Sequence, residues 1–267
     1  MSLVETKNEN TMRYKCFNNN IALVTGAQRG IGLEVAKQLH SQGAIVICLD
    51  VNYPNKTLIE VSTHFYNVYA DVADIDSIHS LIETIEKDIG PINYLASVAG
   101  ILRVTSLLDI DENTLDALIE VNTKGAFFIC RNVALKMKSR KKGSIVAVSS
   151  NAASTPRINI GAYGASKSAL NMLIKTLALE VAPFNIRCNL VSPGSTLTKM
   201  QTDFASGPDA QKSILNGSLE QFRLGVPLNK MATPEDIANS IVYLLSEQAL
   251  QITMHDLVVD GGATLGV

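Results

Sequence analysis

The first apolar segment of the chain leads directly into a glycine-rich turn and then into a helix. Residues 21–25 (IALVT) are typical of a buried β-strand, and residues 26–32 (GAQRGIG) contain three glycines. Leu33, Ala36 and Leu39 follow at helical spacing. In this order of elements the turn directs backbone N–H groups and the positive end of a helix toward a diphosphate, and glycine allows its close approach. We therefore predict a dinucleotide-binding loop, with the spacing GxxxGxG, at the start of an α/β fold.

The same alternation of apolar strands and helical patterns continues to the end of the chain. The expected strands span residues 44–50, 65–70, 94–100, 144–150, 186–192 and 256–260, and the clearest helices span 75–89, 111–138 and 234–246. We predict a single domain from residue 20 to residue 267, in which helices cover both faces of a doubly wound, Rossmann-type parallel sheet. We expect the polar residues 1–19 to be a disordered leader and the polar segment 197–227 to be a mobile lid over the substrate.

Composition argues against several classes of protein. The chain has 23 basic and 25 acidic residues, a net charge of −2, and this balance predicts no nucleic-acid partner. No apolar segment is long enough to cross a bilayer, and the start of the chain is not typical of a signal peptide. The four cysteines and four histidines are scattered without metal-ligand spacing, so we expect reduced thiols and no metal site. These features predict a cytoplasmic protein without a membrane partner.

A candidate catalytic pair lies in the segment AYGASK, residues 162–167, at the start of an apolar helical pattern. Tyr163 and Lys167 are four residues apart, so a helix presents both on one face. A neighbouring ammonium favours the phenolate and lowers the pKa of a tyrosine from its usual value of about 10. Such a base removes a proton from an alcohol near neutral pH. The pair also occurs by chance on helix surfaces, so this prediction depends on the other motifs.

The choice of dinucleotide depends on two residues of opposite charge. Asp50 ends the second expected strand, 18 residues after Gly32, where a ribose-binding carboxylate is expected. A carboxylate there accepts hydrogen bonds from both ribose hydroxyls and repels a 2′-phosphate, which favours NAD over NADP. Arg29 in the turn would pair with such a phosphate and favours the opposite choice. The alternative for Asp50 is a helix cap or turn residue.

Two further polar residues leave alternatives open. Asp71 follows the third expected strand, where it either contacts the adenine or caps the helix over residues 75–89. Asn122 lies in the middle of a long expected helix, where asparagine is mildly unfavourable. It marks either a kink with a function or an ordinary surface amide.

Taken together, these motifs resemble the classical short-chain dehydrogenase/reductase family. The motif TGxxxGIG spans residues 25–32, VNxxG spans 121–125, and YxxxK spans 163–167. A serine, Ser150, stands 13 residues before the tyrosine, and a Pro-Gly pair is followed by threonine within residues 193–198. The joint occurrence of these motifs in this order, over residues 20–267, is far more specific than any one of them.

The resemblance implies a catalytic tetrad of Asn122, Ser150, Tyr163 and Lys167. Ser150 would hold the substrate oxygen, and Tyr163 would be the acid/base. Lys167 would lower the pKa of the tyrosine and bind the nicotinamide ribose, and Asn122 would order a water in a proton relay. The implied cofactor is NAD, bound by Gly26, Gln28, Arg29, Gly30, Ile31, Gly32, Asp50, Asp71, Val72, Ala99, Gly100, Tyr163, Lys167, Pro193, Gly194, Thr196 and Thr198. The family is commonly tetrameric, and the helix after Tyr163 is apolar on more than one face, so we expect a homotetramer.

Five segments resemble, more closely, the family members that oxidise a cyclohexadiene diol carboxylate during catecholate siderophore synthesis. These segments are AGILR (residues 99–103), TPRI (155–158), AYGASKSAL (162–170), RCNLVSPGST (187–196) and ITMHDLVVDGGATLG (252–266). The implied reaction is NAD-dependent oxidation of one ring alcohol, after which the dienone tautomerises to a catechol. Aromatisation would make the step effectively irreversible.

A small carboxylate substrate requires a cation, and arginine is best suited to bidentate pairing. Arg103 and Arg157 follow the fourth and fifth expected strands, at the carboxyl edge of the sheet where ligands bind. We expect at least one of them to bind the carboxylate; the alternative for each is a surface or subunit salt bridge. Met200, Gln201 and Phe204 either cover the ring or pack within the loop.

Two other functions remain open from the sequence. The first is an NADP-dependent carbonyl reductase, for example of a 3-oxoacyl thioester, which Arg29 favours and Asp50 opposes. The second is a dinucleotide-binding sensor without catalytic activity. We expect such a sensor to lose members of the tetrad, and this chain has all four.

Overall fold

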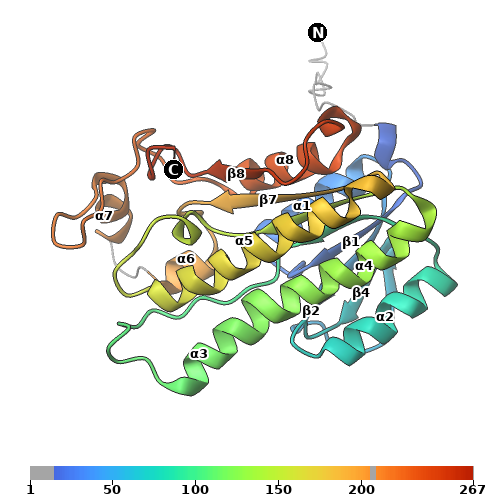
Figure 1. Ribbon diagram of the computed structural model, residues 1–267, viewed down its shortest axis with the longest axis horizontal. Coiled ribbons are helices and arrows are strands. Elements are labelled where there is room, and N and C mark those ends of the chain that lie inside the picture. The colour runs from blue at the N-terminus through green and yellow to red at the C-terminus, as the bar shows by residue number, and fades with distance from the viewer. Residues whose placement is uncertain (1–14, 205–208, 267) are drawn as a thin grey trace, which may run out of the picture.

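An eight-stranded sheet forms the centre of the protein, with the strand order β3-β4-β2-β1-β5-β6-β7-β8 (Figure 1). The computed structural model describes residues 15–204 and 209–266, with only the backbone described at 202–204 and 210. Every neighbouring pair of strands is parallel except β3 and β4. The strands are β1 (Ile21–Thr25), β2 (Ile45–Asp50), β3 (Ile59–Ser62), β4 (Phe65–Tyr69), β5 (Ile92–Ser97), β6 (Gly143–Val148), β7 (Ile186–Pro193) and β8 (Asp256–Val259).

Helices cover both faces of this sheet, which gives three layers (Figure 1). One core cluster joins the sheet to α2, α4 and α5, and the other joins it to α1 and α8. The helices are α1 (Gly30–Ser41), α2 (Ile75–Asp88), α3 (Glu112–Ile119), α4 (Ala126–Arg140), α5 (Gly161–Val181), α6 (Lys199–Phe204), α7 (Ala210–Asn216) and α8 (Pro234–Leu245). The shorter turns are η1 (Lys15–Phe17), η2 (Glu120–Gly125), η3 (Asn151–Ala153), η4 (Ala182–Phe184) and η5 (Glu247–Ala249). This arrangement confirms the predicted doubly wound, single-domain fold.

The central strands are apolar throughout because both of their faces are buried. In β1 all five residues are buried; Leu23 belongs to the core beneath α2, α4 and α5, whereas Ala22 and Val24 belong to the core beneath α1 and α8. Side chains alternate between the faces of a strand, so a strand covered on both sides reads as a continuous apolar run. This pattern made the central strands easy to predict.

The sheet brings its loops to one edge, where the sequence motifs meet. The order of strands changes direction between β1 and β5, so the segments after these two strands separate at that edge. The turn after β1 therefore lies near the loop after β6 and the start of α5, although more than a hundred residues of the chain separate it from both. In Figure 1, α6 and α7 lie beyond the carboxyl end of β7.

Three parts of the chain differ from the sequence predictions. Strand β3 was not predicted, because all four of its residues are exposed and no buried face marks it. The long helix expected over residues 111–138 is divided into α3, the π-helical turn η2 and α4. The segment 197–227, expected to be irregular, contains α6 and α7; its residues 205–208 lie outside the described part of the chain.

Residues 15–19, the described part of the expected leader, contain a helical turn. Lys15–Phe17 form η1, and Phe17 is fully buried, with its ring edge-to-face with Tyr94 at a centroid distance of 4.9 Å. One buried aromatic ring stabilises this segment against the sheet, and the polar residues around it hid that contact from the sequence pattern. Residues 1–14 of the expected leader lie outside the described residues. None of the described helices is long and apolar enough to cross a membrane.

Candidate active site

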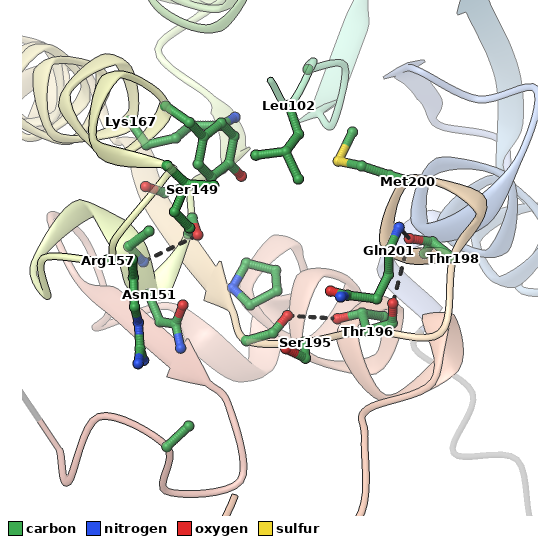
Figure 2. Close-up of a pocket in the computed structure, with 18 of the residues that line it drawn as sticks. Leu102, Ser149, Asn151, Arg157, Lys167, Ser195, Thr196, Thr198, Met200 and Gln201 are labelled. Atoms are coloured by element: carbon green, nitrogen blue, oxygen red, sulfur yellow. Dashed lines mark hydrogen bonds between the residues drawn. The ribbon is translucent and has the colours of Figure 1, made fainter. Parts of the chain in front are cut away.

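A cavity of about 330 Å³ opens at the carboxyl edge of the sheet, next to the start of α5 (Figure 2). In Figure 2, Lys167 and Arg157 lie on one side of it, and Met200, Gln201 and Thr198 lie on the other. The lining is contributed by the segments that follow β5, β6 and β7, by the first turns of α5, and by residues 221–226. Its volume is at the lower end of the range for small-molecule sites.

Helix α5 presents Tyr163 and Lys167 to this cavity, so the prediction that they share a helix face is confirmed. Lys167 is only 3% exposed, and its Nζ donates a hydrogen bond to the Val148 carbonyl at the end of β6, at 2.9 Å. Burial lowers the pKa of Lys167 to about 8, because the charged ammonium is disfavoured away from water. Gly164 allows the helix to start close to η3, since a Cβ there would lie 2.7 Å from the Ala152 carbonyl oxygen.

The pKa of Tyr163 differs from the sequence prediction. Burial raises it above its usual value, and a hydrogen bond with Ser150 only partly opposes this effect. The prediction of a lowered pKa was therefore wrong for the protein without its cofactor. It considered the charge of Lys167 but not the desolvation of the phenolate, and in the structure the Lys167 ammonium is directed at the Val148 carbonyl.

Ser150 and Asn122 both lie close to this pair, but their surroundings differ. Ser150 is 8% exposed, caps η3 by accepting a hydrogen bond from Ala152 N at 3.1 Å, and lines the cavity. Asn122 is fully buried in the π-helical turn η2. Its Oδ1 accepts from Ile101 N at 2.8 Å, and its Nδ2 donates to Ile101 O at 2.9 Å and to Ser166 Oγ at 3.1 Å. Asn122 thus marks a distortion of the helix, as one alternative predicted, and is not a surface amide.

The glycine-rich turn after β1 is built for close approach. Gly26 has φ +64°, and a Cβ there would lie 2.9 Å from the Ala99 Cα; a Cβ on Gly32 would lie 2.2 Å from the Gly26 carbonyl oxygen. The turn is also fixed by Thr25, whose Oγ1 accepts hydrogen bonds from Val98 N and Ala99 N, both at 3.0 Å. Sequence reasoning quoted Thr25 only as part of the motif and assigned it no role.

The start of α1 lacks a side-chain cap. Arg29 occupies the N-cap position without a side-chain hydrogen bond to the helix. The first backbone N–H groups of a helix require acceptors, and the helix dipole favours an anion at this end. The turn, with Gly30 at φ +57°, therefore fits a phosphate group as the motif predicts.

Asp50 connects this turn to the end of β2. Its Oδ2 accepts a hydrogen bond from Gln28 N at 3.1 Å, and its Oδ1 accepts from Asn52 N at 2.9 Å and from Asn52 Nδ2 at 2.7 Å. Asp50 thus has the role of a turn residue, which the sequence offered as an alternative to ribose binding. A carboxylate has about four acceptor sites, so these three hydrogen bonds leave capacity for a hydroxyl donor.

Asp71 follows β4 but does not cap α2, so that alternative was wrong. Its Oδ1 accepts from Ala73 N at 2.9 Å, and the cap of α2 is Asp74, which accepts from Ser77 N. The error arises because two aspartates lie close together before the helix, and the pattern does not say which one begins it.

The structure divides the expected cofactor residues between two places. Those that line the cavity are Ile31, Gly100, Tyr163, Lys167, Pro193, Gly194, Thr196 and Thr198. Those outside its lining are Gly26, Gln28, Arg29, Gly30, Gly32, Asp50, Asp71, Val72 and Ala99, on the turn after β1 and at the ends of β2, β4 and β5. The two groups adjoin at the turn, where the Cβ position of Gly30 lies 3.4 Å from Thr198 Cγ2.

The expected substrate residues are placed differently from one another. Arg157, Met200 and Gln201 line the cavity, and Gln201 Nε2 is buried without a hydrogen-bond partner among the described residues. Arg103 is exposed, donates to the neighbouring Leu102 carbonyl at 3.0 Å, and does not line the cavity. The side chain of Phe204 lies outside the described residues.

Arg157 is half-buried, and burial lowers its pKa, an effect that the negative charge of Asp260 opposes. Sequence reasoning missed a second arginine in this cavity, Arg223, which lies between α7 and α8. One arginine in a polar loop gives no sequence signal of this placement.

Comparisons with known proteins agree with this geometry. A family model described as "Enoyl-(Acyl carrier protein) reductase" matches residues 26–264. The chain is 45% identical over 262 residues to the 2,3-dihydro-2,3-dihydroxybenzoate dehydrogenase of Bacillus subtilis (strain 168), which covers 96% of this chain and 100% of the relative. It is 41% identical over 255 residues to the vibriobactin-specific 2,3-dihydro-2,3-dihydroxybenzoate dehydrogenase of Vibrio cholerae, with coverage of 92% and 97%. A solved structure described as a "short chain dehydrogenase/reductase family protein" has a TM-score of 0.80 at 30% identity, with coverage of 94% and 99%.

The fold, the site and the relatives lead to one classification. The match over most of the chain confirms the family that the sequence motifs resemble, and with it an oxidoreductase that binds a nicotinamide dinucleotide. The uncapped start of α1 and the glycine-rich turn fit that cofactor. The chain belongs to the short-chain dehydrogenase/reductase family.

Proposed function

We propose that the protein oxidises 2,3-dihydro-2,3-dihydroxybenzoate to 2,3-dihydroxybenzoate, with NAD as the hydride acceptor, as a step of catecholate siderophore biosynthesis. The observation that carries this proposal is the cavity that Ser150, Tyr163 and Lys167 share with Arg157. Side chains that could accept a proton and pair with a carboxylate therefore line the same small space, which supports the proposal. The two relatives above, which are named for this reaction, support the choice of substrate.

In the proposed mechanism, Tyr163 accepts the proton of the ring C3 hydroxyl, and the hydroxyl oxygen becomes a carbonyl. NAD, when bound, accepts the hydride from the carbinol carbon. Ser150, at the end of β6, hydrogen-bonds the same oxygen and positions it against Tyr163. The resulting dienone then tautomerises to the catechol. Since the pKa of Tyr163 is raised by burial, the phenolate depends on the positive charge of Lys167 and of the oxidised nicotinamide ring.

Asn122 has a positioning role in this proposal. Its side-chain amide bonds the segment after β5 to helix α5, through Ile101 and Ser166. It therefore keeps the loop near Gly100 at a fixed place beside Lys167; a Cβ on Gly100 would lie 3.1 Å from Asn122 Oδ1 and 3.2 Å from Lys167 Nζ. A water-ordering role, which the family resemblance implies, would have to use the backbone of this turn.

NAD is favoured over NADP by Asp50. This carboxylate is 8% exposed and adjoins the Gln28 amide of the turn, so a 2′-phosphate placed there would meet a negative charge of low solvation. The exposed side chain of Arg29 stands on the same turn and supports the rival choice. We give the acid more weight because charges near the protein interior are screened less than exposed ones.

We propose a homotetramer that is assembled through α4 and α5. On these helices Leu135, Met172 and Leu179 are at least half exposed, at 51%, 66% and 63%. Large apolar patches on a soluble protein are typical of interaction sites. A cytoplasmic location is supported by the four cysteines, which are all free.

The proposal is tested by following NADH absorbance with purified protein, NAD and 2,3-dihydro-2,3-dihydroxybenzoate. We expect turnover by the natural chain, and for Tyr163→Phe a loss of nearly all turnover with NAD binding retained. Tyr243→Phe, which removes the same hydroxyl from a tyrosine of α8 that does not line the cavity, is the control and keeps its activity. Near-normal turnover by Tyr163→Phe would refute the assignment of the base.

The second candidate function is an NADP-dependent carbonyl reductase, which the exposed Arg29 favours. It predicts tighter binding of NADPH than of NADH and consumption of a 3-oxoacyl thioester. Titration of both cofactors in parallel decides between the two enzymes. Tight dinucleotide binding without turnover of any alcohol or ketone would instead indicate a sensor.

A further inference from the structure

Two arginines line the active-site cavity from segments that are far apart in the sequence. Arg157 lies after η3, and Arg223 lies between α7 and α8. Both are half-buried, and both face the same space as Tyr163. We call the two segments that carry them, residues 151–160 and 217–225, the substrate wall.

Neither guanidinium has an ion-pair partner among the described residues. The ion pairs found among the described residues involve other cationic side chains, namely His79, Lys124, Lys136 and Arg140. The acidic group whose charge acts on Arg157 is Asp260. Its carboxylate already accepts hydrogen bonds from Asn151 Nδ2 at 3.2 Å, Gly262 N at 2.9 Å, and Thr264 N and Oγ1 at 3.0 and 2.8 Å.

The two positive charges also act on each other. The pKa of Arg223 is lowered by burial and, in addition, by the charge of Arg157. Arginine nonetheless remains protonated in proteins, so this repulsion is not relieved by the loss of a proton. Two partly desolvated cations that repel one another are stabilised by an anion placed between them.

The backbone holds Arg223 in a defined turn. Arg223 N donates to Ser218 O, and Ser218 N donates to Arg223 O, both at 2.9 Å. Gly217 and Gly225, with φ of +80° and +88°, flank the turn and approach each other so closely that a Cβ on Gly217 would lie 2.7 Å from Gly225 N. The side chain is therefore presented to the cavity by a built structure.

We propose that Arg157 and Arg223 together form the carboxylate subsite, and that Arg223 determines the preference for ring substrates that carry an acid. The inference deepens the proposed function and rests on it for the identity of the ring, but the anion subsite itself does not require turnover. A ring held by its carboxylate at the substrate wall has a fixed orientation in the cavity. Arg223 thus also helps to select which of the two ring hydroxyls faces Tyr163.

The test is a comparison of two ligands that differ only in the acid. Calorimetry measures the dissociation constants of 2,3-dihydroxybenzoate and of catechol, with and without saturating NAD. We expect the natural chain to bind the acid more tightly, and Arg223→Gln to weaken its binding by about tenfold to hundredfold, the usual loss for a hydrogen bond to a charged group. Catechol binding by this variant should stay unchanged.

Two further variants separate the pairing geometry from net charge and from folding. Lys212→Gln removes the same charge from an exposed side chain on α7 and should bind the acid like the natural chain. Arg223→Lys keeps the charge but loses the planar fork, so it should restore only part of the affinity. In the oxidation assay, Arg223→Gln should raise KM far more than it lowers kcat.

Three results would overturn the inference. The first is a natural chain that binds the acid no more tightly than catechol. The second is an equal loss of affinity for 2,3-dihydroxybenzoate and for catechol in Arg223→Gln, which would indicate a structural role. The third is unchanged acid binding in that variant. The natural chain could also fail to oxidise the dihydrodiol while Arg223→Gln still loses affinity for the acid and not for catechol. In that case the proposed substrate is wrong and the anion subsite is supported.

Discussion

The turn after β1 and the substrate wall differ in how their residues come together. In the turn, the residues of the motif lie within eight positions, Thr25 to Gly32, between one strand and one helix, and contacts from the ends of the neighbouring strands β2 and β5 complete it. In the substrate wall, Arg157 and Arg223 come from segments on opposite sides of α5 and β7 in the chain. The motif residues of the first region are consecutive in the chain, so a sequence pattern marks them, whereas the arginines of the second region come together only in the folded protein. A short motif therefore predicts the cofactor site, and no motif predicts the substrate site.

Helix α5 lies between the two regions in the chain. Substitution of its Lys167 should have the largest effect on turnover. Lys167→Met should lower kcat/KM by about 10²- to 10⁴-fold, the usual contribution of acid–base catalysis, because the phenolate of Tyr163 then lacks its neighbouring charge. The pKa of Lys167 is about 8, and that of Tyr163 is raised. The pair therefore loses its first proton near pH 8, whichever of the two groups carries the remaining one.

The pH dependence of this variant separates a catalytic role of the lysine from a structural one. For the natural chain, kcat/KM should rise with pH and level off above about pH 8, since the reactive form has lost one proton from the pair. In Lys167→Met only Tyr163 titrates, and its raised pKa means that the rate should still be rising at the alkaline end of the range. Lys37→Met, on the exposed face of α1, is the control. A variant whose profile keeps its plateau near pH 8 would exclude the pairing.

The next effect concerns the turn alone. In Gly32→Ala the new Cβ would lie 2.2 Å from the Gly26 carbonyl oxygen, a backbone atom that cannot move without opening the turn. Such overpacking costs about 1–3 kcal/mol, so we expect NAD affinity to fall by about tenfold to hundredfold. Binding of 2,3-dihydroxybenzoate without cofactor should be unaffected. Lys37→Ala, at an exposed position of the same helix, is the control. An equal loss of affinity for NAD and for 2,3-dihydroxybenzoate would show that the two regions are not independent.

These two regions also explain how much could be predicted from the sequence. The central strands were correctly predicted because burial on both faces makes them continuously apolar, and the pair on α5 because helical spacing fixes which residues share a face. The same reasoning failed for β3, which is wholly exposed, and for η1, where a single ring, Phe17, determines the packing. Strand β3 has no buried face for the pattern to mark, and η1 depends on a contact with Tyr94, which is distant in the chain.

The candidate site shows the same division. Motif spacing led to Ser150, Tyr163 and Lys167, and the position after the fifth expected strand led to Arg157; the structure brings all four to one cavity. It missed Arg223, because no local pattern connects a loop between α7 and α8 to the end of β6. It also gave the wrong direction for the pKa of Tyr163, since the depth of burial is a property of the folded protein.

A smaller effect tests the cofactor preference at the end of β2, where Asp50 contacts the turn through Gln28 N. Asp50→Asn keeps the size of the side chain but removes its charge, so the ratio of NADP to NAD in kcat/KM should rise by about tenfold. The amide also loses an acceptor at one of the contacts with Gln28 N and Asn52, so NAD binding should weaken by a similar factor. Paired cofactor titrations measure both. A ratio that does not change would show that Arg29, and not Asp50, controls the choice.

The smallest expected effect is that of Arg103, which serves as a comparison for the arginines of the substrate wall. Arg103 was one of two arginines expected at the carboxylate, but it is exposed and bonds only the adjacent Leu102 carbonyl among the described contacts. Arg103→Gln should therefore change KM for the acid substrate by less than about twofold, the usual range for surface substitutions. Arg157→Gln should raise the same KM by about tenfold or more, because it removes a cation that lines the cavity. If the two variants gave the reverse order, the carboxylate would lie at the segment after β5, and substrate choice would be a local property of the chain after all.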